Sequence, residues 1–86
     1  MSFYTYVIAS TNPSLKTYVG WTTDIKKRLA KHNSGKGAKS TRGRNWKLIY
    51  KEKFDTKTKA MKREYKIKKD QSFRNKLRNK IWKFFL

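Results

Sequence analysis

The sequence predicts a small α/β domain in which a three-stranded antiparallel sheet is flanked by helices, in the order ββαβαα. Three segments are rich in aromatic and β-branched residues, which is typical of strands. A turn separates the first two of them, and the other segments place apolar residues at helical spacing. The 86 residues are expected to form one domain over 1–86, without a repeat or a linker.

The first two strands are expected to form a hairpin. Phe3–Ser10 reads "FYTYVIAS", a run that suits a strand. The following "TNPSLK" contains Asn-Pro, which starts turns. Thr17–Trp21 then returns as the second strand, so a loop of about six residues joins the pair.

A first helix is expected after the hairpin. Thr22 or Thr23 can cap its N-terminus, and Asp24 in its first turn suits the positive end of the helix dipole. Gly35 is expected just past its C-terminal end. The stripe that faces the core contains Ile25, Leu29 and His32.

A loop, a third strand and a second helix are expected next. Residues 35–44 have no periodicity and no acid, which predicts a loop. Trp46–Phe54 alternates apolar residues with lysines, which predicts a strand with one face in water. Its apolar positions are Trp46, Leu48 and Tyr50. Asp55 or Thr56 can cap a helix that runs to about Lys69.

The C-terminal segment 71–86 is expected to form the last helix, capped by Ser72. Its apolar stripe contains Phe73, Leu77, Ile81 and Phe84. The closing "WKFFL" serves either the core or a partner surface.

The charge of the chain indicates a polyanionic partner. There are 24 Lys and Arg against 5 Asp and Glu, a formal charge of +19. Phosphate-rich DNA or RNA relieves such self-repulsion and gains affinity from counterion release. No apolar run approaches the ~20 residues of a spanning helix, and the first residues do not resemble a signal peptide. We therefore expect a cytoplasmic protein, nucleoid-associated if bacterial, with no membrane partner.

One acidic residue differs from the others. Asp24 and Asp55 lie at expected helix starts, where capping explains them. Glu64 falls inside the apolar arc of the second helix, where a carboxylate is costly unless it is paired or bound to a metal. Either an ion pair with one of the many basic residues or a metal site explains this position.

Four further residues are candidates for a polar site. Tyr6 and Tyr18 lie on the two paired strands, close enough to frame a shared cleft, although strand tyrosines ordinarily serve packing. Arg28 and His32 lie one helical turn apart on one surface. His32 is either a buried, hydrogen-bonded core residue or part of that cleft. Arg28 is either a solvated charge or a bidentate phosphate ligand.

Taken together these residues resemble the GIY-YIG nuclease domain, in its short stand-alone branch. The likeness covers roughly Phe3 to Asp70. The features that carry it are, in chain order, Tyr4-Thr5-Tyr6, Tyr18-Val19-Gly20, the pair Arg28 and His32, the loop Asn33–Gly43 with the sequence "NSGKGAKSTRG", and Glu64 in "AMKREYKIK".

The resemblance implies a compact α/β fold and a metal-dependent DNA endonuclease. Glu64 would hold Mg²⁺ or Mn²⁺, and Tyr6 would activate the attacking water with Tyr18 positioning it or sharing that role. Arg28 would stabilise charge on the phosphate, and His32 would orient a tyrosine or relay a proton. Together the metal and Arg28 are expected to favour the phenolate form of Tyr6.

The remaining functional residues concern DNA contact. Gly20 would let the backbone approach the site. Phosphate contacts are expected from the loop residues Lys36, Lys39, Arg42 and Arg44, which give affinity without a sequence code. No small-molecule cofactor is expected.

The sequence also departs from the family pattern. The first motif lacks its namesake glycine, and the asparagine of many larger members has no clear counterpart, since Asn75 and Asn79 lie in the terminal helix. No separate DNA-reading domain is expected, so the resemblance implies low base specificity and selection of DNA structure in repair or recombination. One alternative is a basic nucleic-acid-binding protein with this fold and negligible catalysis. Another is an interaction protein that acts through residues 81–86.

Overall fold

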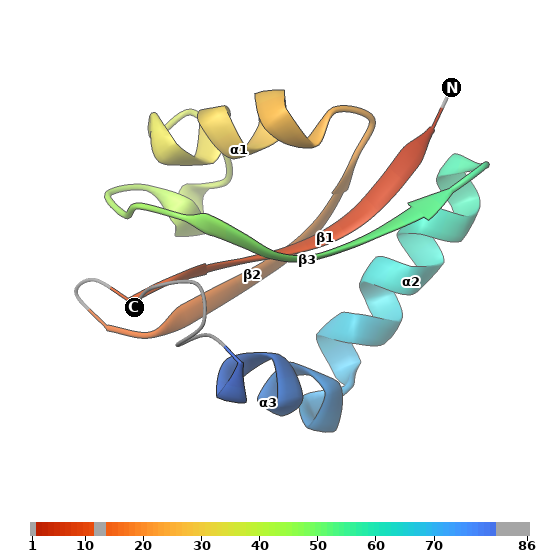
Figure 1. Ribbon diagram of the computed structural model, residues 1–86. Helices are drawn as coiled ribbons and strands as arrows, with labels where there is room; N and C mark the ends of the chain where they lie inside the picture. Colours follow the sequence, from red (N-terminus) through yellow and green to blue (C-terminus); the bar gives the residue numbers. More distant parts are fainter. Residues whose placement is uncertain (1, 12–13, 81–86) are drawn as a thin grey trace.

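The computed structural model describes residues 2–11 and 14–80 and has three layers. A three-stranded antiparallel sheet forms the middle layer. Figure 1 shows α1 on one face of the sheet and α2 and α3 on the other. The predicted fold class and the order ββαβαα are confirmed.

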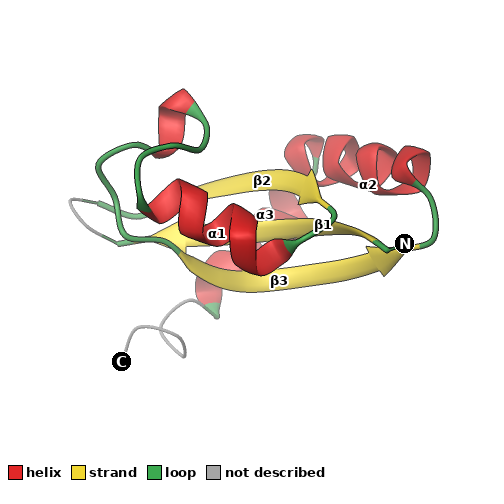
Figure 2. Cartoon of the chain, turned by 90° about the horizontal axis from the view of Figure 1, so that it is seen from above, coloured by secondary structure: helices red, strands yellow, loops and turns green. Residues whose placement is uncertain are grey.

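The sheet contains β1 (Phe3–Ser10), β2 (Lys16–Thr22) and β3 (Lys47–Phe54). The strand order is β2-β1-β3, and both pairs are antiparallel. β1 is therefore central, and Figure 2 shows it between the other two strands. A central strand is covered on both faces, which accounts for the burial of six of its eight residues.

A β-bulge changes which side chains of β3 share a face. Val7 pairs with Tyr50, whereas the next residue, Ile8, pairs with Leu48, so Ile49 is the extra residue. Because side chains alternate along a strand, one inserted residue reverses their direction beyond it. The prediction that Trp46, Leu48 and Tyr50 share one face, with water on the other, is therefore wrong.

The two faces of the sheet carry separate cores. On the α1 face, Tyr6, Ile8 and Trp46 are buried, and Tyr18, Leu29 and Leu48 pack against them. On the face of α2 and α3, the buried residues are Val7, Ala9, Val19, Ile49 and Ile67, with Tyr50, Phe73 and Leu77 against them. Both faces of this small sheet are thus used for packing.

The first helix, α1 (Ile25–Asn33), begins at an aspartate. The side chain of Asp24 accepts a hydrogen bond from the Lys27 amide at 3.1 Å, so Asp24 is the cap, not Thr22 or Thr23. Gly35 follows the helix with φ of +80°, a conformation that favours glycine, as predicted.

The other helices are η1 (Lys39–Thr41), α2 (Lys57–Lys69) and α3 (Gln71–Asn79). The cap of α2 is Thr56, one of the two predicted candidates. The cap of α3 is Asp70, not Ser72, because Asp70 accepts the Phe73 amide at 2.9 Å. The short 3₁₀ helix η1 lies in a segment that was predicted to be loop.

The predictions for Ile81, Phe84 and the "WKFFL" segment concern residues that lie outside the described part of the chain. Within 2–11 and 14–80, no helix is long and apolar enough to cross a membrane.

Candidate active site

Tyr6 reaches across the edge strand because position 20 has no side chain. Tyr6 and Gly20 are cross-strand partners in the β1–β2 pair. A Cβ atom at position 20 would lie 2.6 Å from the Tyr6 hydroxyl and 2.8 Å from the ring carbon that bears it. Gly20 therefore lets a side chain occupy this space, which is the reverse of the expected close approach of backbone to substrate.

A chain of hydrogen bonds runs from Tyr6 through His32 into the loop. The Tyr6 hydroxyl lies 2.8 Å from His32 Nε2, and His32 Nδ1 lies 2.9 Å from the Thr41 hydroxyl. That hydroxyl donates its own hydrogen to the Ala38 carbonyl at 2.8 Å. Thr41 must then accept from Nδ1–H of His32, which leaves Nε2 as the acceptor for the Tyr6 hydroxyl.

The loop before β3 is folded against His32. The Trp46 indole donates to the Thr41 carbonyl at 2.8 Å, which holds η1 in place. A Cβ atom at position 37 would lie 2.5 Å from His32 Nδ1, so Gly37 allows the loop backbone to pass over the imidazole. His32 and Thr41 are fully buried as a result.

The prediction of an unstructured loop missed Gly37, Thr41 and Trp46 as parts of the site. The sequence does contain a glycine five residues after the only histidine, and a threonine follows nearby. The roles of these residues in the site depend on tertiary contacts, which no local sequence pattern specifies.

A small cavity lies where β1, β2, α1 and α2 meet. Its volume is about 230 Å³, and it is lined by Tyr6, Tyr18, Gly20, Trp21, Arg28 and Glu64. His32 lies behind it, with its ring centroid 5.0 Å from that of Tyr18. The structure therefore brings together the five predicted catalytic residues and Gly20, and adds Trp21.

Arg28 presents unused hydrogen-bonding capacity at this cavity. Hydrogen bonding to Tyr6 raises the pKa of Arg28, so the guanidinium stays charged. Its Nε atom is buried and has no hydrogen-bond partner among the described residues. A buried donor without a partner is costly, and an anion in the cavity would satisfy it.

The electrostatics keep both Tyr6 and His32 neutral. Burial raises the pKa of Tyr6, and hydrogen bonding and charge from Arg28 offset only part of this effect. The expectation that Arg28 favours the phenolate is right in direction, but burial outweighs it. Burial, followed by the nearby Arg28 charge, lowers the pKa of His32. At neutral pH Nε2 of the imidazole therefore carries no proton, and its lone pair accepts the Tyr6 hydroxyl.

Glu64 forms an ion pair and also lines the cavity, so the ion-pair alternative is confirmed and the metal site stays a prediction. Its carboxylate lines the cavity, with its side chain 20% exposed, and one oxygen accepts a hydrogen bond from Lys68 Nζ at 2.8 Å. Between residues 2 and 80, Asn12 and Pro13 aside, no three His, Asp or Glu side chains are grouped as metal ligands. A cation here would have one carboxylate, with water and phosphate oxygens as its other ligands, a pattern that suits Mg²⁺.

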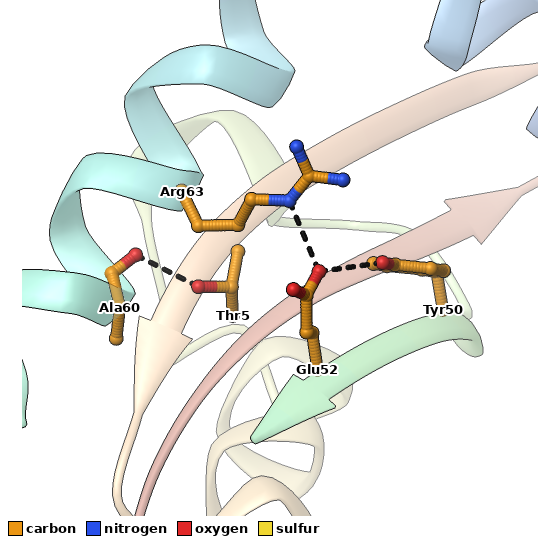
Figure 3. Close-up of polar contacts among 5 residues, drawn as sticks. All are labelled: Thr5, Tyr50, Glu52, Ala60 and Arg63. Atoms are coloured by element: carbon orange, nitrogen blue, oxygen red, sulfur yellow. Dashed lines mark hydrogen bonds and ion pairs between the residues drawn. The ribbon is translucent and has the colours of Figure 1, made fainter. Parts of the chain in front are cut away.

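Helix α2, which carries Glu64, is fixed to the sheet by polar contacts. The Thr5 hydroxyl on β1 donates to the Ala60 carbonyl of α2 at 2.7 Å, a buried contact (Figure 3). Arg63 Nε donates to Glu52 on β3 at 3.0 Å. The same Glu52 oxygen accepts the hydroxyl of Tyr50 at 2.6 Å.

This attachment determines where Glu64 points. Consecutive helical side chains differ by about 100° around the axis. With Arg63 held over β3 by Glu52, the next residue is turned toward β2, at the opposite edge of the sheet. Glu64 lines the cavity there.

Of the four basic loop residues, three have exposed side chains and the fourth forms hydrogen bonds to the hairpin. Lys36, Lys39 and Arg42 are exposed. Arg44 instead donates to the Ser14 carbonyl at 2.6 Å and to its hydroxyl at 3.4 Å, which ties the loop to the β1–β2 hairpin. The free cations lie in the same loop that encloses His32, close in sequence to the site.

The chain resembles known proteins along almost its whole length. Residues 2–79 match the GIY-YIG catalytic domain. The chain is 50% identical over 66 residues to the UPF0213 protein SSP2268 of Staphylococcus saprophyticus, which covers 76% of this chain and 78% of that relative. For the UPF0213 protein NP_0776A of Natronomonas pharaonis the identity is 46% over 66 residues, covering 76% and 75%.

A solved structure shows the same likeness. The solution NMR structure of the UPF0213 protein BH0048 from Bacillus halodurans is 36% identical to this chain. The comparison covers 94% of this chain and 85% of that one, with a TM-score of 0.50. All residues that line the cavity lie inside the matched region 2–79.

Proposed function

Because the chain belongs to the GIY-YIG catalytic domain family, we propose that it is a metal-dependent endonuclease that hydrolyses phosphodiester bonds of DNA. The observation that supports this most directly is the cavity, where one carboxylate, two phenols and a guanidinium with an unpartnered Nε converge. Such a hydrolysis needs a general base, a cation that stabilises negative charge on the phosphate, and a ligand for the metal.

The proton path is proposed to run from water through Tyr6 to His32. Tyr6 is neutral, so its oxygen accepts a proton from the attacking water only as its own hydroxyl proton moves to His32 Nε2. The Nδ1–H bond to Thr41 holds the imidazole in the tautomer that this transfer requires. The water oxygen bonds to phosphorus, the bond from phosphorus to the oxygen of the leaving strand breaks, and that oxygen takes a proton from solvent.

Two further residues complete the proposed chemistry. Arg28 would bind the non-bridging phosphate oxygens, where negative charge builds up as the water attacks. Glu64 would hold Mg²⁺ or Mn²⁺, which when bound supplies Lewis-acid stabilisation of the phosphate and its leaving oxygen. Lys68 would release the Glu64 oxygen that it pairs with in this structure.

DNA would be held mainly through phosphate. Lys36, Lys39 and Arg42 are exposed cations of the loop, and they bind phosphate without reading base edges. The activity would therefore show little base specificity and would select DNA by its structure. We place it in the cytoplasm, in DNA repair or recombination.

Cleavage of DNA by the purified protein tests this proposal. Linear, nicked and branched DNA are incubated in Mg²⁺ or Mn²⁺ with wild type, with Glu64→Gln and with Asp55→Asn as a control of equal charge change. Glu64→Gln is expected to lower the cleavage rate by about 100-fold or more, because the one carboxylate that the described residues bring to the cavity is lost. Asp55→Asn is expected to cleave like wild type, since Asp55 is exposed and paired with Lys59.

Equal cleavage by wild type and Glu64→Gln would contradict the proposal and identify a contaminating nuclease. Tight DNA binding without any cleavage would instead support the second candidate, a basic DNA-binding protein with this fold. The Lys68–Glu64 ion pair and the formal charge of +19 favour that candidate.

A further inference from the structure

A second hollow adjoins the cavity, and its lining is chiefly apolar. It has a volume of about 700 Å³ and shares Trp21 and Glu64 with the cavity. Its other main walls are Met61 and Tyr65 on α2. We call it the aromatic groove, defined by Trp21, Met61 and Tyr65.

The two groove side chains on α2 are exposed although they are apolar and the helix is otherwise highly charged, while Trp21 is half-buried. Met61 is 45% exposed and Tyr65 is 59% exposed, on a helix that is mostly lysine on its outer surface. Large apolar groups that are grouped beside a polar site, and that no described residue covers, mark a binding surface more often than packing.

Cations surround the groove. The ammonium group of Lys57 lies 5.3 Å from the centroid of the Trp21 ring, and that of Lys69 lies 4.4 Å from the Tyr65 ring. Lys62 and Lys66 line the same groove. An apolar protein segment would leave these charges without partners, whereas a nucleic-acid strand offers flat apolar bases next to anionic phosphates.

We propose that the aromatic groove binds an unpaired nucleobase of the strand whose phosphate occupies the adjacent cavity. The base would stack on the rings of Tyr65 and Trp21, and the surrounding lysines would contact its flanking phosphates. Bases inside an intact duplex are already stacked and paired, so they cannot enter. The inference rests on the proposed function and names its substrate class, which is DNA with unpaired nucleotides at the cleavage position.

The test measures binding of fluorescent oligonucleotides by the wild-type chain with divalent cations removed, so that no DNA is cut. The probes are a short single strand, the same strand with abasic sugars in its centre, and a duplex. The normal single strand is expected to bind about tenfold tighter than its abasic analogue, because base–aromatic stacking is lost in the latter. Tyr65→Ala is expected to remove this difference, and Tyr65→Phe to keep it.

Leu15→Ala serves as the matched control. Leu15 is 46% exposed, belongs to the hairpin loop and lies outside the groove. This variant is expected to bind all three probes like wild type. Sedimentation of wild type and Tyr65→Ala without DNA shows whether a second copy of the chain occupies the groove instead.

The outcomes separate this inference from the nuclease proposal. Equal affinity for normal and abasic strands, or a Tyr65→Ala effect on self-association alone, would overturn the base-binding groove even if Glu64-dependent cleavage persists. Base-dependent binding through Tyr65 would support the groove even if no Glu64-dependent cleavage were found, and only the nuclease proposal would then fail.

Discussion

At the residue scale, neighbouring groups determine where the protons of the site lie. Burial raises the pKa of Tyr6 and lowers that of His32, so neither carries a charge at neutral pH. The Thr41 hydroxyl donates its hydrogen to the Ala38 carbonyl, so it must accept the hydrogen of His32 Nδ1. His32 Nε2 is then left without a hydrogen and accepts the Tyr6 hydroxyl. A phenolate is then unnecessary, because the phenol can pass on one proton while it receives another.

The first prediction concerns Thr41→Val, which keeps the shape but removes the acceptor for His32 Nδ1–H. The buried N–H would lose its partner, so the free energy of unfolding is expected to fall by about 1–3 kcal/mol. ¹⁵N NMR of the imidazole is expected to show a larger fraction of the Nε2–H tautomer. Cleavage is expected to slow by about tenfold or more, because Tyr6 loses its proton acceptor.

Thr17→Val is the control for this prediction. Thr17 is half-buried on β2 and lies outside the chain of hydrogen bonds. It is expected to leave the tautomer and the cleavage rate unchanged. A Thr41→Val protein with an unaltered imidazole spectrum would show that Thr41 does not determine the tautomer.

The second prediction is that stability falls as the pH is lowered below 6.5. The pKa of His32 in the folded chain lies below its ordinary value of 6.5, so the unfolded chain takes up the proton first as the pH falls. The unfolded state binds more protons in this window, and the free energy of unfolding decreases by at most about 1.4 kcal/mol per pH unit. The decrease ends below the folded pKa, where both states are protonated.

Urea denaturation across this window measures the effect. His32→Gln cannot take up a proton there, so its stability is expected to be flat over the same pH range. Both proteins carry the same carboxylates, so these groups do not account for a difference between the two pH profiles. An equally steep decrease in His32→Gln would assign the effect to other groups.

At the element scale, α2 is the link between the sheet and Glu64. Thr5 and Glu52, on two different strands, each bind one residue of this helix. Their bonds fix the rotation of α2 about its axis, and the rotation fixes which wall of the molecule Glu64 faces. The site therefore depends on contacts on the face of the sheet opposite to His32.

The third prediction concerns Arg63→Met, which removes the ion pair to Glu52 while keeping an unbranched side chain. The free energy of unfolding is expected to fall by about 1 kcal/mol, because the pair is partly exposed and screened by solvent. The cleavage rate is expected to fall by more than the loss of folded protein explains, since α2 can then rotate and move Glu64.

Lys59→Met is the matched control, because it breaks the exposed ion pair between Lys59 of α2 and Asp55, which precedes the helix. No measurable change in stability or cleavage is expected from it. If the loss of folded protein accounts for the cleavage rate of both variants, Arg63 has no positioning role.

The elements that local patterns specify were predictable from the sequence. Phe3–Ser10 was expected as a strand and is one with the same bounds, and α2 ends at Lys69 as predicted. The bulge opposite Val7 and Ile8 was not predictable, because it depends on how β3 pairs with β1. Asp24 was not predicted as the cap because Thr22, Thr23 and Asp24 can each cap a helix. Which of them does so depends on the backbone conformation where the helix begins.

The candidate site was predictable to a similar extent. The resemblance supplied Tyr6, Tyr18, Arg28, His32 and Glu64, and all but His32 line the cavity while His32 bonds Tyr6 behind it. Thr41 and Gly37 were not identified, because their roles arise from the fold of the loop over the imidazole. Long-range contacts of this kind leave no periodicity in the sequence.

At the scale of the whole molecule, the charge of +19 dominates the interaction with any polyanion. Each phosphate that a Lys or Arg neutralises releases condensed counterions, so affinity for DNA decreases steeply with salt. The charges are spread over both faces of the sheet, and total charge therefore does not reveal which face carries the DNA. Most of the site, including Tyr6 and Arg28, lies on the α1 side of the sheet, while Glu64 reaches it from α2, and this position makes a specific prediction.

The last prediction compares the loop that contains η1 with α3, on the other face of the sheet. Lys36→Gln with Lys39→Gln is expected to reduce the salt slope, the fall of log affinity with log salt, by about 1.8, or about 0.9 per lost contact. Lys76→Gln with Lys80→Gln removes the same charge from α3 and its C-cap, and is expected to change the slope less, because α3 lies on the face away from α1. Equal reductions in titrations of duplex DNA at several salt concentrations would mean that DNA coats the molecule without a preferred face. A reduction confined to the loop pair would place the DNA backbone beside the residues that enclose His32, where a scissile phosphate must lie if the cavity is catalytic.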